Sequence, residues 1–143
     1  MTSLKAKIFA SAFANAGLQA LLGTSPFRLY DVQLDQGQAG YYPCVTMMII
    51  SNPRAYAHGA GRFATSWARV QFTVFGTGND SQNAAAVVEA LLSWLDSFNP
   101  TGQASCPQIG ACIVVGDRDG GIAQTQPLTY QRFLDVAIFY KET

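Results

Sequence analysis

The sequence predicts an α+β domain with a mixed, mainly antiparallel sheet and two helices packed on one face. Its clearest evidence lies in residues 66–98. Val70, Phe72 and Val74 alternate with polar residues, which is the two-residue repeat of a strand with one buried face. After a glycine-rich break, apolar residues recur at intervals of three and four over 80–98, as on one stripe of an amphipathic helix. Further strand patterns joined by short connections complete the fold class.

The N-terminal segment is predicted to be helical from about Ser3 to Leu22. Leu4, Ile8 and Ala12 fall mainly along one helical face, and Gly23 supplies the usual left-handed stop. Polar residues interrupt the apolar stretch, which favours an amphipathic helix over a cleaved signal peptide. The sequence has no run of about 18 consecutive apolar residues, so we expect no membrane span.

Two strand patterns follow this helix. A short strand is predicted at 27–32, before a polar, glycine-rich loop at 33–40. The next strand, 41–51, is almost continuously apolar from Cys44 onward, which indicates a strand covered on both faces or placed at a subunit contact. The segment 52–65 is predicted to be either a long exposed hairpin or a partly ordered loop between strands.

The last third of the chain reads as two strands. After the central helix, a proline- and glycine-containing loop is predicted at 100–110 and a short strand at 111–115. The stretch 116–121 has three glycines and indicates turns. A long alternating pattern at 129–141 predicts the final strand. We therefore expect one domain spanning residues 1–143.

The composition is typical of a protein that contacts other proteins, and it also fits a low-charge monomer. Hydrophobic residues make up 49% of the chain and charged residues only 13%, which leaves a weakly polar surface. With 9 basic and 9 acidic residues the net charge is zero, so the basic excess of a nucleic-acid binder is missing. The three cysteines form an odd set without CxxC spacing, which fits a reducing cytosol better than a disulfide scaffold.

The motifs that could indicate a catalytic or ligand-binding site lack the sequence context that such a site needs. The GxGxxA pattern at 59–64 follows a polar segment and precedes a strand, whereas a dinucleotide site needs a strand before it and a helix after it. Residues 117–120 begin like a calcium loop but lack the remaining ligands. His58, the only histidine, lies in a predicted loop without an elbow serine or a clustered acid pair. We expect no enzymatic activity, no cofactor and no metal site.

Four stretches together resemble a known family. They are an N-terminal helix ending in LLGTSPFRLYDVQL, the proline-led strand YYPCVTMMII, the central unit SWARVQFTVFGTGNDSQNAAAVVEALLSWLDSF and the C-terminal strand RFLDVAIFYK. The chain resembles the tail-completion (tail-to-head joining) proteins of long-tailed phages, which are similar in fold to the tail terminator of lambda-like phages. The resemblance covers nearly the whole chain and rests on the shape of the elements.

This resemblance implies a non-enzymatic structural protein of the virion, made in the host cytoplasm. Such proteins form a homo-oligomeric ring, usually of six subunits, at the head-proximal end of the tail tube, in the neck of the particle. The ring ends polymerisation of the tail tube protein and presents a surface to the head connector or stopper protein. Genomic DNA passes through the ring as cargo without sequence-specific binding, and no membrane is involved.

The surplus of apolar and aromatic residues locates the predicted subunit contacts. Aromatic residues make up 12% of the chain, more than one small core needs, and they are enriched at protein–protein contacts. We expect contacts on the strands at 41–51 and 67–75, on the loop at 54–62 and on the edge of the C-terminal strand. The predicted interface residues are Tyr42, Met48, Arg54, Tyr56, Arg62, Trp67, Arg69, Gln71, Phe75, Phe133 and Phe139.

Three alternatives stay open. The first is another neck or head-closure protein, or a minor tail protein, because the same α+β fold recurs among tail tube and terminator proteins and the sequence alone separates these roles poorly. The second belongs to a different class: a small cytoplasmic ligand-binding domain. The third, ranked last, is a hydrolase that uses Cys112 or Cys106 with His58.

Overall fold

A computed structural model of the chain describes residues 4–24, 27–31, 43–51, 56–57, 61–62, 65–77, 81–97, 108–123 and 129–141. The elements follow one another as α1 (Leu4–Phe13), α2 (Ala16–Leu22), β1 (Leu29–Asp31), β2 (Cys44–Ser51), β3 (Tyr56–Ala57), β4 (Gly61–Arg62), β5 (Thr65–Thr77), α3 (Ser81–Asp96), β6 (Gln108–Ala123) and β7 (Thr129–Lys141). The predicted α+β class is confirmed.

The first predicted helix is two helices. Asn15 has extended backbone angles, φ −82° and ψ 118°, which end α1. Its side-chain oxygen accepts a hydrogen bond from the backbone N–H of Leu18 at 3.0 Å, so Asn15 caps the start of α2. Gly23, with φ 80°, ends α2 as predicted. Apolar periodicity continues across the break, which is why the sequence pattern predicted one helix.

Five strands form one mixed sheet in the order β1-β2-β5-β7-β6. Only β1 and β2 are parallel, and the other three pairs are antiparallel. β5 pairs with β7 along its whole length, from Thr65 opposite Lys141 to Thr77 opposite Thr129. The C-terminal strand β7 therefore lies inside the sheet. This corrects the expectation that its edge is free for subunit contacts.

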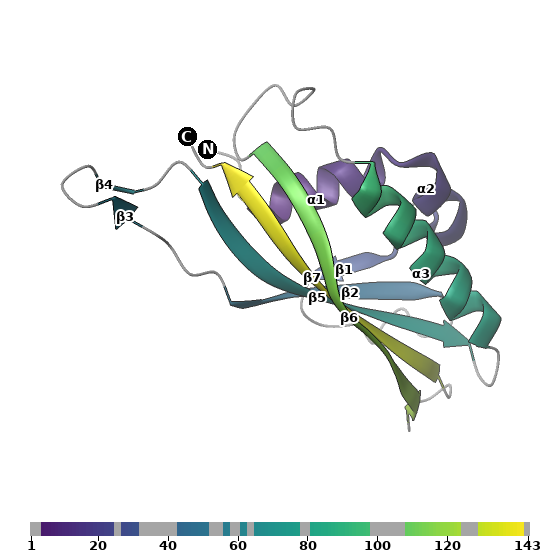
Figure 1. Cartoon of the computed structure of the whole chain (residues 1–143). Helices are drawn as coiled ribbons and strands as arrows, with labels where there is room; N and C mark the ends of the chain where they lie inside the picture. The colour runs from purple at the N-terminus through teal and green to yellow at the C-terminus, as the bar shows by residue number, and fades with distance from the viewer. Residues whose placement is uncertain are drawn as a thin grey trace.

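All three helices cover the same face of the sheet (Figure 1). The layers share one core, in which the fully buried Phe72 of β5 meets Trp94 of α3 edge to face, with ring centroids 6.1 Å apart. The indole N–H of Trp94 donates to Ser11 Oγ at 3.2 Å and so joins α3 to α1. Arg28 donates to the carbonyl oxygens of Leu21 and Pro43, at 2.8 and 2.9 Å, and ties α2 to the start of β2. The expected single helix layer is present, with three helices in it instead of two.

Strand β6 contradicts the predicted turn at 116–121. It is a continuous strand of 16 residues that pairs with β7 through that glycine-rich stretch. The register shifts at three places, and Gly110, Val115 and Gly120 are the extra residues there. Such bulges let a strand take up additional residues without losing its partner. The glycines of this segment thus occur within a strand.

Within the segment predicted as a hairpin or a loop, β3 and β4 form a short antiparallel ladder. Tyr56 pairs with Arg62 and Ala57 with Gly61, in a separate two-stranded sheet. Figure 1 shows these two strands apart from the five-stranded sheet and the helices. No described helix is long and apolar enough to cross a bilayer.

Candidate assembly interface

The face of the sheet that lies opposite the helices gathers several of the predicted interface residues. The antiparallel register places Trp67 of β5 opposite Phe139 of β7. It also places Gln71 of β5 opposite Met48 of β2. Residues directly opposite each other in a ladder point to the same face. Because the helix-covered face takes the alternate residues of each strand, this second surface is called the open face here.

The predicted residues differ in how much of their side chain reaches the surface. Trp67, Met48 and Arg69 are exposed. Four others are half-buried: Gln71, Phe75, Phe133 and Phe139. The strand arrangement thus brings these seven residues together on β2, β5 and β7. Their role as a subunit interface stays a prediction.

The other predicted interface residues are described less fully. Tyr42 and Arg54 lie outside the described residues. Tyr56 and Arg62 are directly paired across the β3–β4 ladder, where the backbone alone is described. Both belong to the small separate sheet, so they are not neighbours of the open-face residues in the sheet ladder.

Sequence reasoning missed the edge strand β6 as an interface candidate. Its outer edge has no partner among the described strands, and Ile113 and Val115 are 52% and 53% exposed on it. Val114 between them is also exposed. Long, apolar edge strands are templates for pairing with another chain, which natural proteins usually block with charges or prolines. The apolar run at 112–115 was the available signal, but the following glycines indicated a turn instead of a continuing strand.

The opposite edge of the sheet has a similar character. β1 pairs only with Val45, Thr46 and Met47 of β2. The second half of β2 pairs with β5 on one side and has no described partner on its outer side. Met48 and Ile50 are exposed there. One sheet therefore has exposed apolar residues at both of its lateral edges.

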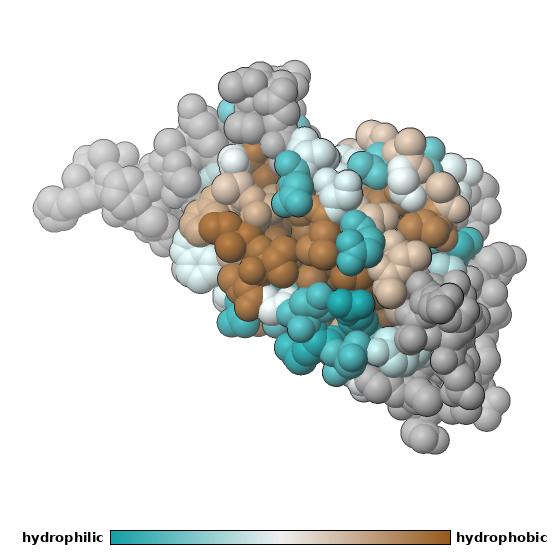
Figure 2. Space-filling view, turned by 45° about the vertical axis from the view of Figure 1, so that its right-hand side comes forward, coloured by the Kyte–Doolittle hydropathy of each residue, from teal (hydrophilic) through white to brown (hydrophobic). Residues whose placement is uncertain are grey.

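Hydrophobic and polar surface lie next to each other on this molecule. On the side that Figure 2 turns forward, hydrophobic side chains form one continuous area and hydrophilic side chains gather below it. A contiguous apolar area rimmed by polar residues is typical of a contact surface on a soluble protein.

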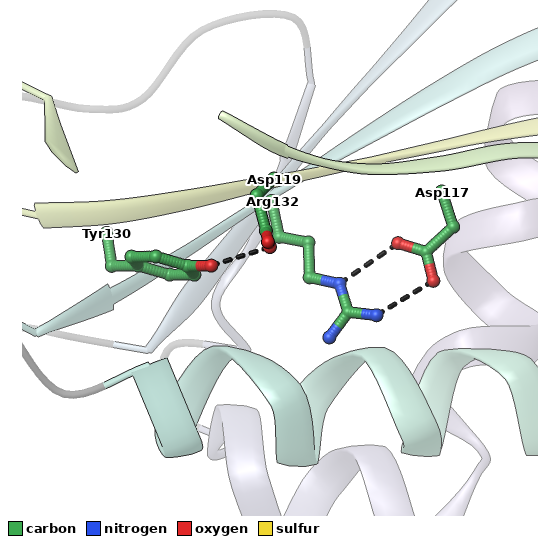
Figure 3. A network of polar contacts seen from close by, with 4 residues as sticks. All are labelled: Asp117, Asp119, Tyr130 and Arg132. Atoms are coloured by element: carbon green, nitrogen blue, oxygen red, sulfur yellow. Dashed lines mark hydrogen bonds and ion pairs between the residues drawn. The ribbon is translucent and has the colours of Figure 1, made fainter. Parts of the chain in front are cut away.

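The second half of β6 is joined to β7 by polar side chains (Figure 3). Arg132 donates two parallel hydrogen bonds to Asp117, at 2.9 and 2.8 Å. Tyr130 donates its hydroxyl proton to Asp119. The hydrogen bond to Asp119 is the main reason that the pKa of Tyr130 lies above its usual value, and the Asp117 contact raises the pKa of Arg132. These pairs hold the glycine-containing half of β6 against its neighbour.

A second charged cluster lies on the open face. The carboxylate of Asp135 is almost fully buried, with its Oδ2 atom 3.2 Å from Arg118 Nη1 and 3.8 Å from Arg69 Nη2. The three residues come from three adjacent strands, β5, β7 and β6. The sequence predicted Arg69 as a surface residue but did not connect it to the other two, because only the ladder brings them together.

The described cysteines are poor candidates for nucleophiles. Burial raises the pKa of the Cys44 thiol to about 12, and burial, helped by Asp96, does the same for Cys112. A reactive cysteine needs a lowered pKa, because the thiolate is the attacking form. Cys106 and His58 lie outside the described residues. Among the residues described, no group of three or more His, Cys, Asp or Glu side chains is arranged to hold a metal ion.

Comparisons with known proteins show a fold likeness. The sequence matches no established protein-family profile and no curated protein. Its structure is similar to a chain from the virion of a native gene transfer agent (GTA) particle, with a TM-score of 0.66 and 16% sequence identity. The alignment covers 96% of this chain and 95% of that chain. The likeness therefore concerns the whole domain, and at this identity it is a likeness of fold.

Proposed function

We propose that this chain is a structural protein of a phage-like virion that forms a ring at the head-proximal end of the tail. In this role it ends polymerisation of the tail tube and joins the tail to the head, with DNA passing through the ring. The fold likeness to a chain of a gene transfer agent virion, over almost the full length of both chains, supports a place in such a particle. Function here is geometric and involves no catalysis.

The exposed apolar residues at both lateral edges of the sheet carry the proposal. A contact that joins two different surfaces of identical subunits is head-to-tail, and it closes into a ring when its rotation divides a full turn. The β6 edge, with Ile113 and Val115, and the β2 edge, with Met48 and Ile50, are two such different surfaces. Edge-to-edge pairing would also satisfy the free backbone groups of both strands.

The helix layer sets the orientation of the sheet in such a ring. A closed ring of sheets has a longer circumference on its outside than on its inside. The bulkier helix layer fits the outside, so the open face lines the channel. In this arrangement the subunit contacts predicted on that face move to the two lateral edges of the sheet. Termination follows if one end of the ring matches the last ring of the tail tube while the other end matches the head connector instead.

The direct test is the oligomeric state of the purified full chain, measured by native mass spectrometry and light scattering over a range of concentrations. We expect a closed ring of defined subunit number in wild type. Val115→Lys places a charge on the exposed apolar edge and should give monomers, because pairing there would bury an unpaired cation. Ser93→Lys, on the exposed face of α3, is the matched control and should leave the ring intact.

Two outcomes would contradict this proposal. One is a monomer at every concentration, both alone and after addition of tail tubes. The other is a ring that Val115→Lys does not disturb. Electron microscopy of particles lacking the protein should show overlong or unjoined tails. A pull-down with tail tube protein, and another with connector protein, shows which of the two binds this chain. The result separates a terminator from other neck proteins and minor tail proteins.

A further inference from the structure

The charged cluster on the open face combines a buried anion with two exposed cations. Asp135 is 5% exposed, whereas the side chains of Arg118 and Arg69 are 58% and 48% exposed. Both guanidinium groups therefore keep N–H donors toward solvent while they share one carboxylate beneath them. The cluster has two positive charges and one negative charge, which leaves it with a net charge of +1.

Local structure explains how the carboxylate is accommodated. Gly116 of β6 lies opposite Asp135, and a Cβ atom at this glycine would be 3.4 Å from Asp135 Oδ2. Gly116 therefore lies in van der Waals range of the carboxylate, on the same face of the sheet. The guanidinium of Arg118 also lies over the ring of Phe133, with its carbon 4.8 Å from the ring centroid, so its position is set from two sides.

The carboxylate of Asp135 has one oxygen atom that accepts no hydrogen bond from the described residues. This atom, Oδ1, is buried. A carboxylate can accept several hydrogen bonds at once. Arg69 Nη2, 3.8 Å from Oδ2, pairs with this carboxylate by charge. Burying a carboxylate in this way costs free energy, and truncating one partner of a buried pair is usually destabilising. The cluster therefore holds both cations and reduces the positive potential that they project from the sheet.

We propose that Arg69 and Arg118 contact the phosphates of double-stranded DNA that passes over the open face, and that Asp135 keeps this contact weak. The inference rests on the proposed function, which places the open face toward the channel. Guanidinium groups match phosphate geometry and bind it bidentately. DNA in transit has to move, so each contact must be brief. A carboxylate that competes for the same N–H donors shortens the contact without removing the cations that keep the channel attractive to DNA.

The test measures binding of a fluorescent DNA duplex of random sequence to the full chain by anisotropy, at about 50 mM and about 200 mM salt. Wild type should bind weakly. Asp135→Asn should bind more tightly at the lower salt, because both arginines are released from the carboxylate. Between the two salt concentrations, the ratio of the DNA affinity of Asp135→Asn to that of wild type should fall roughly three- to fourfold for each additional phosphate that an arginine neutralises. Adding Arg69→Gln and Arg118→Gln to this variant should restore weak binding.

Asp117→Asn is the matched control. It also removes one negative charge from the β6–β7 pair, but Asp117 pairs with Leu134 in the ladder and so lies on the helix-facing side. An equal rise in affinity for Asp117→Asn would mean that net charge alone decides, and it would overturn the proposal. Equal duplex affinity for wild type and a folded Asp135→Asn variant would overturn it as well. The proposal would also fail if Asp135→Asn gained affinity for polyglutamate but not for the DNA duplex.

The two proposals can fail separately. Native mass spectrometry of the same samples reports the ring, and anisotropy reports the DNA contact. A ring in which Asp135→Asn leaves DNA affinity unchanged overturns the DNA contact alone, whereas a monomer with raised affinity contradicts the ring alone. If Asp135→Asn does not fold, Arg69→Gln/Arg118→Gln in the wild-type background should bind DNA more weakly, with a shallower salt dependence. Unchanged binding by that variant would overturn the proposal.

Discussion

Arg132 of β7 binds Asp117 of β6 through two parallel hydrogen bonds of 2.9 and 2.8 Å. This pair lies where the sequence pattern indicated turns, and it helps to keep that stretch in the outermost strand. Both side chains are about one-quarter to one-third exposed, so solvent screens their attraction.

Breaking this pair should loosen the outer half of β6. We expect Asp117→Ala to lower the free energy of unfolding by about 0.5–1 kcal/mol, and Arg132→Ala to do the same. A double-mutant cycle monitored by urea denaturation measures the coupling. Hydrogen exchange should become faster in the second half of β6 and stay unchanged in α3. Purely additive losses, without faster exchange in β6, would contradict the role given to this pair.

Gly120 should resist any side chain. A Cβ atom there would lie 2.3 Å from Phe133 Cε2, so the ring would have to leave its place under the Arg118 guanidinium. We expect Gly120→Ala to cost about 1–3 kcal/mol of unfolding free energy, measured by chemical denaturation. Gly110→Ala is the control at another bulge of the same strand. Its Cβ would meet the Phe139 carbonyl oxygen at 3.7 Å, an ordinary contact, so it should change stability little.

The hydrogen bond that caps α2 can be tested by substituting Asn15. Asn15→Ala removes the acceptor for the Leu18 N–H and should cost about 1 kcal/mol of unfolding free energy. Asn15→Asp keeps a side-chain oxygen at this position and should retain most of the stability. Thermal unfolding of the two variants beside wild type provides the comparison. Equal losses for both would show that the break between α1 and α2 does not depend on this hydrogen bond.

The buried thiol of Cys44 and the half-buried thiol of Cys112 should make stability fall at high pH. Folding raises the pKa of Cys44 and Cys112 from 9.0 to about 12, so above pH 9 the unfolded chain has lost protons that the folded chain retains. Their contribution is fully present below pH 9 and declines as the pH rises toward 12, by up to about 1.4 kcal/mol per pH unit for each thiol. Cys44→Ala/Cys112→Ala should show a shallower decline than wild type, and equal slopes would contradict the burial of the thiols.

Much of the fold could be predicted because its signals are local. The alternation in β5, the helical stripe of α3 and the alternation in β7 each repeat within a few residues, and each is confirmed as an element. A strand's period of two and a helix's period of 3.6 follow from backbone geometry, so burial of one face leaves its pattern in the sequence. The open-face positions of Trp67 and Arg69 followed from the same alternation.

The features that the sequence did not predict depend on which segments pair or pack against each other. Glycines in 116–121 indicated turns by themselves, but ladder hydrogen bonds to β7 and side-chain pairs such as Asp117–Arg132 keep them in a strand. No local pattern states that β6 is the outer strand or that β7 lies inside the sheet. For the same reason the Asp135 cluster could not be foreseen, since its three residues are far apart in sequence and adjacent only in the ladder.

The sequence alone determined the fold class, the strand and helix faces and the low-charge, aromatic-rich composition, because side-chain periodicity and composition are properties of each segment. The tertiary structure decided the break at Asn15, the sheet order, the two apolar edges and the burial of Asp135. These depend on hydrogen bonds and packing between segments that lie far apart along the chain, and a one-dimensional pattern contains no record of such partners.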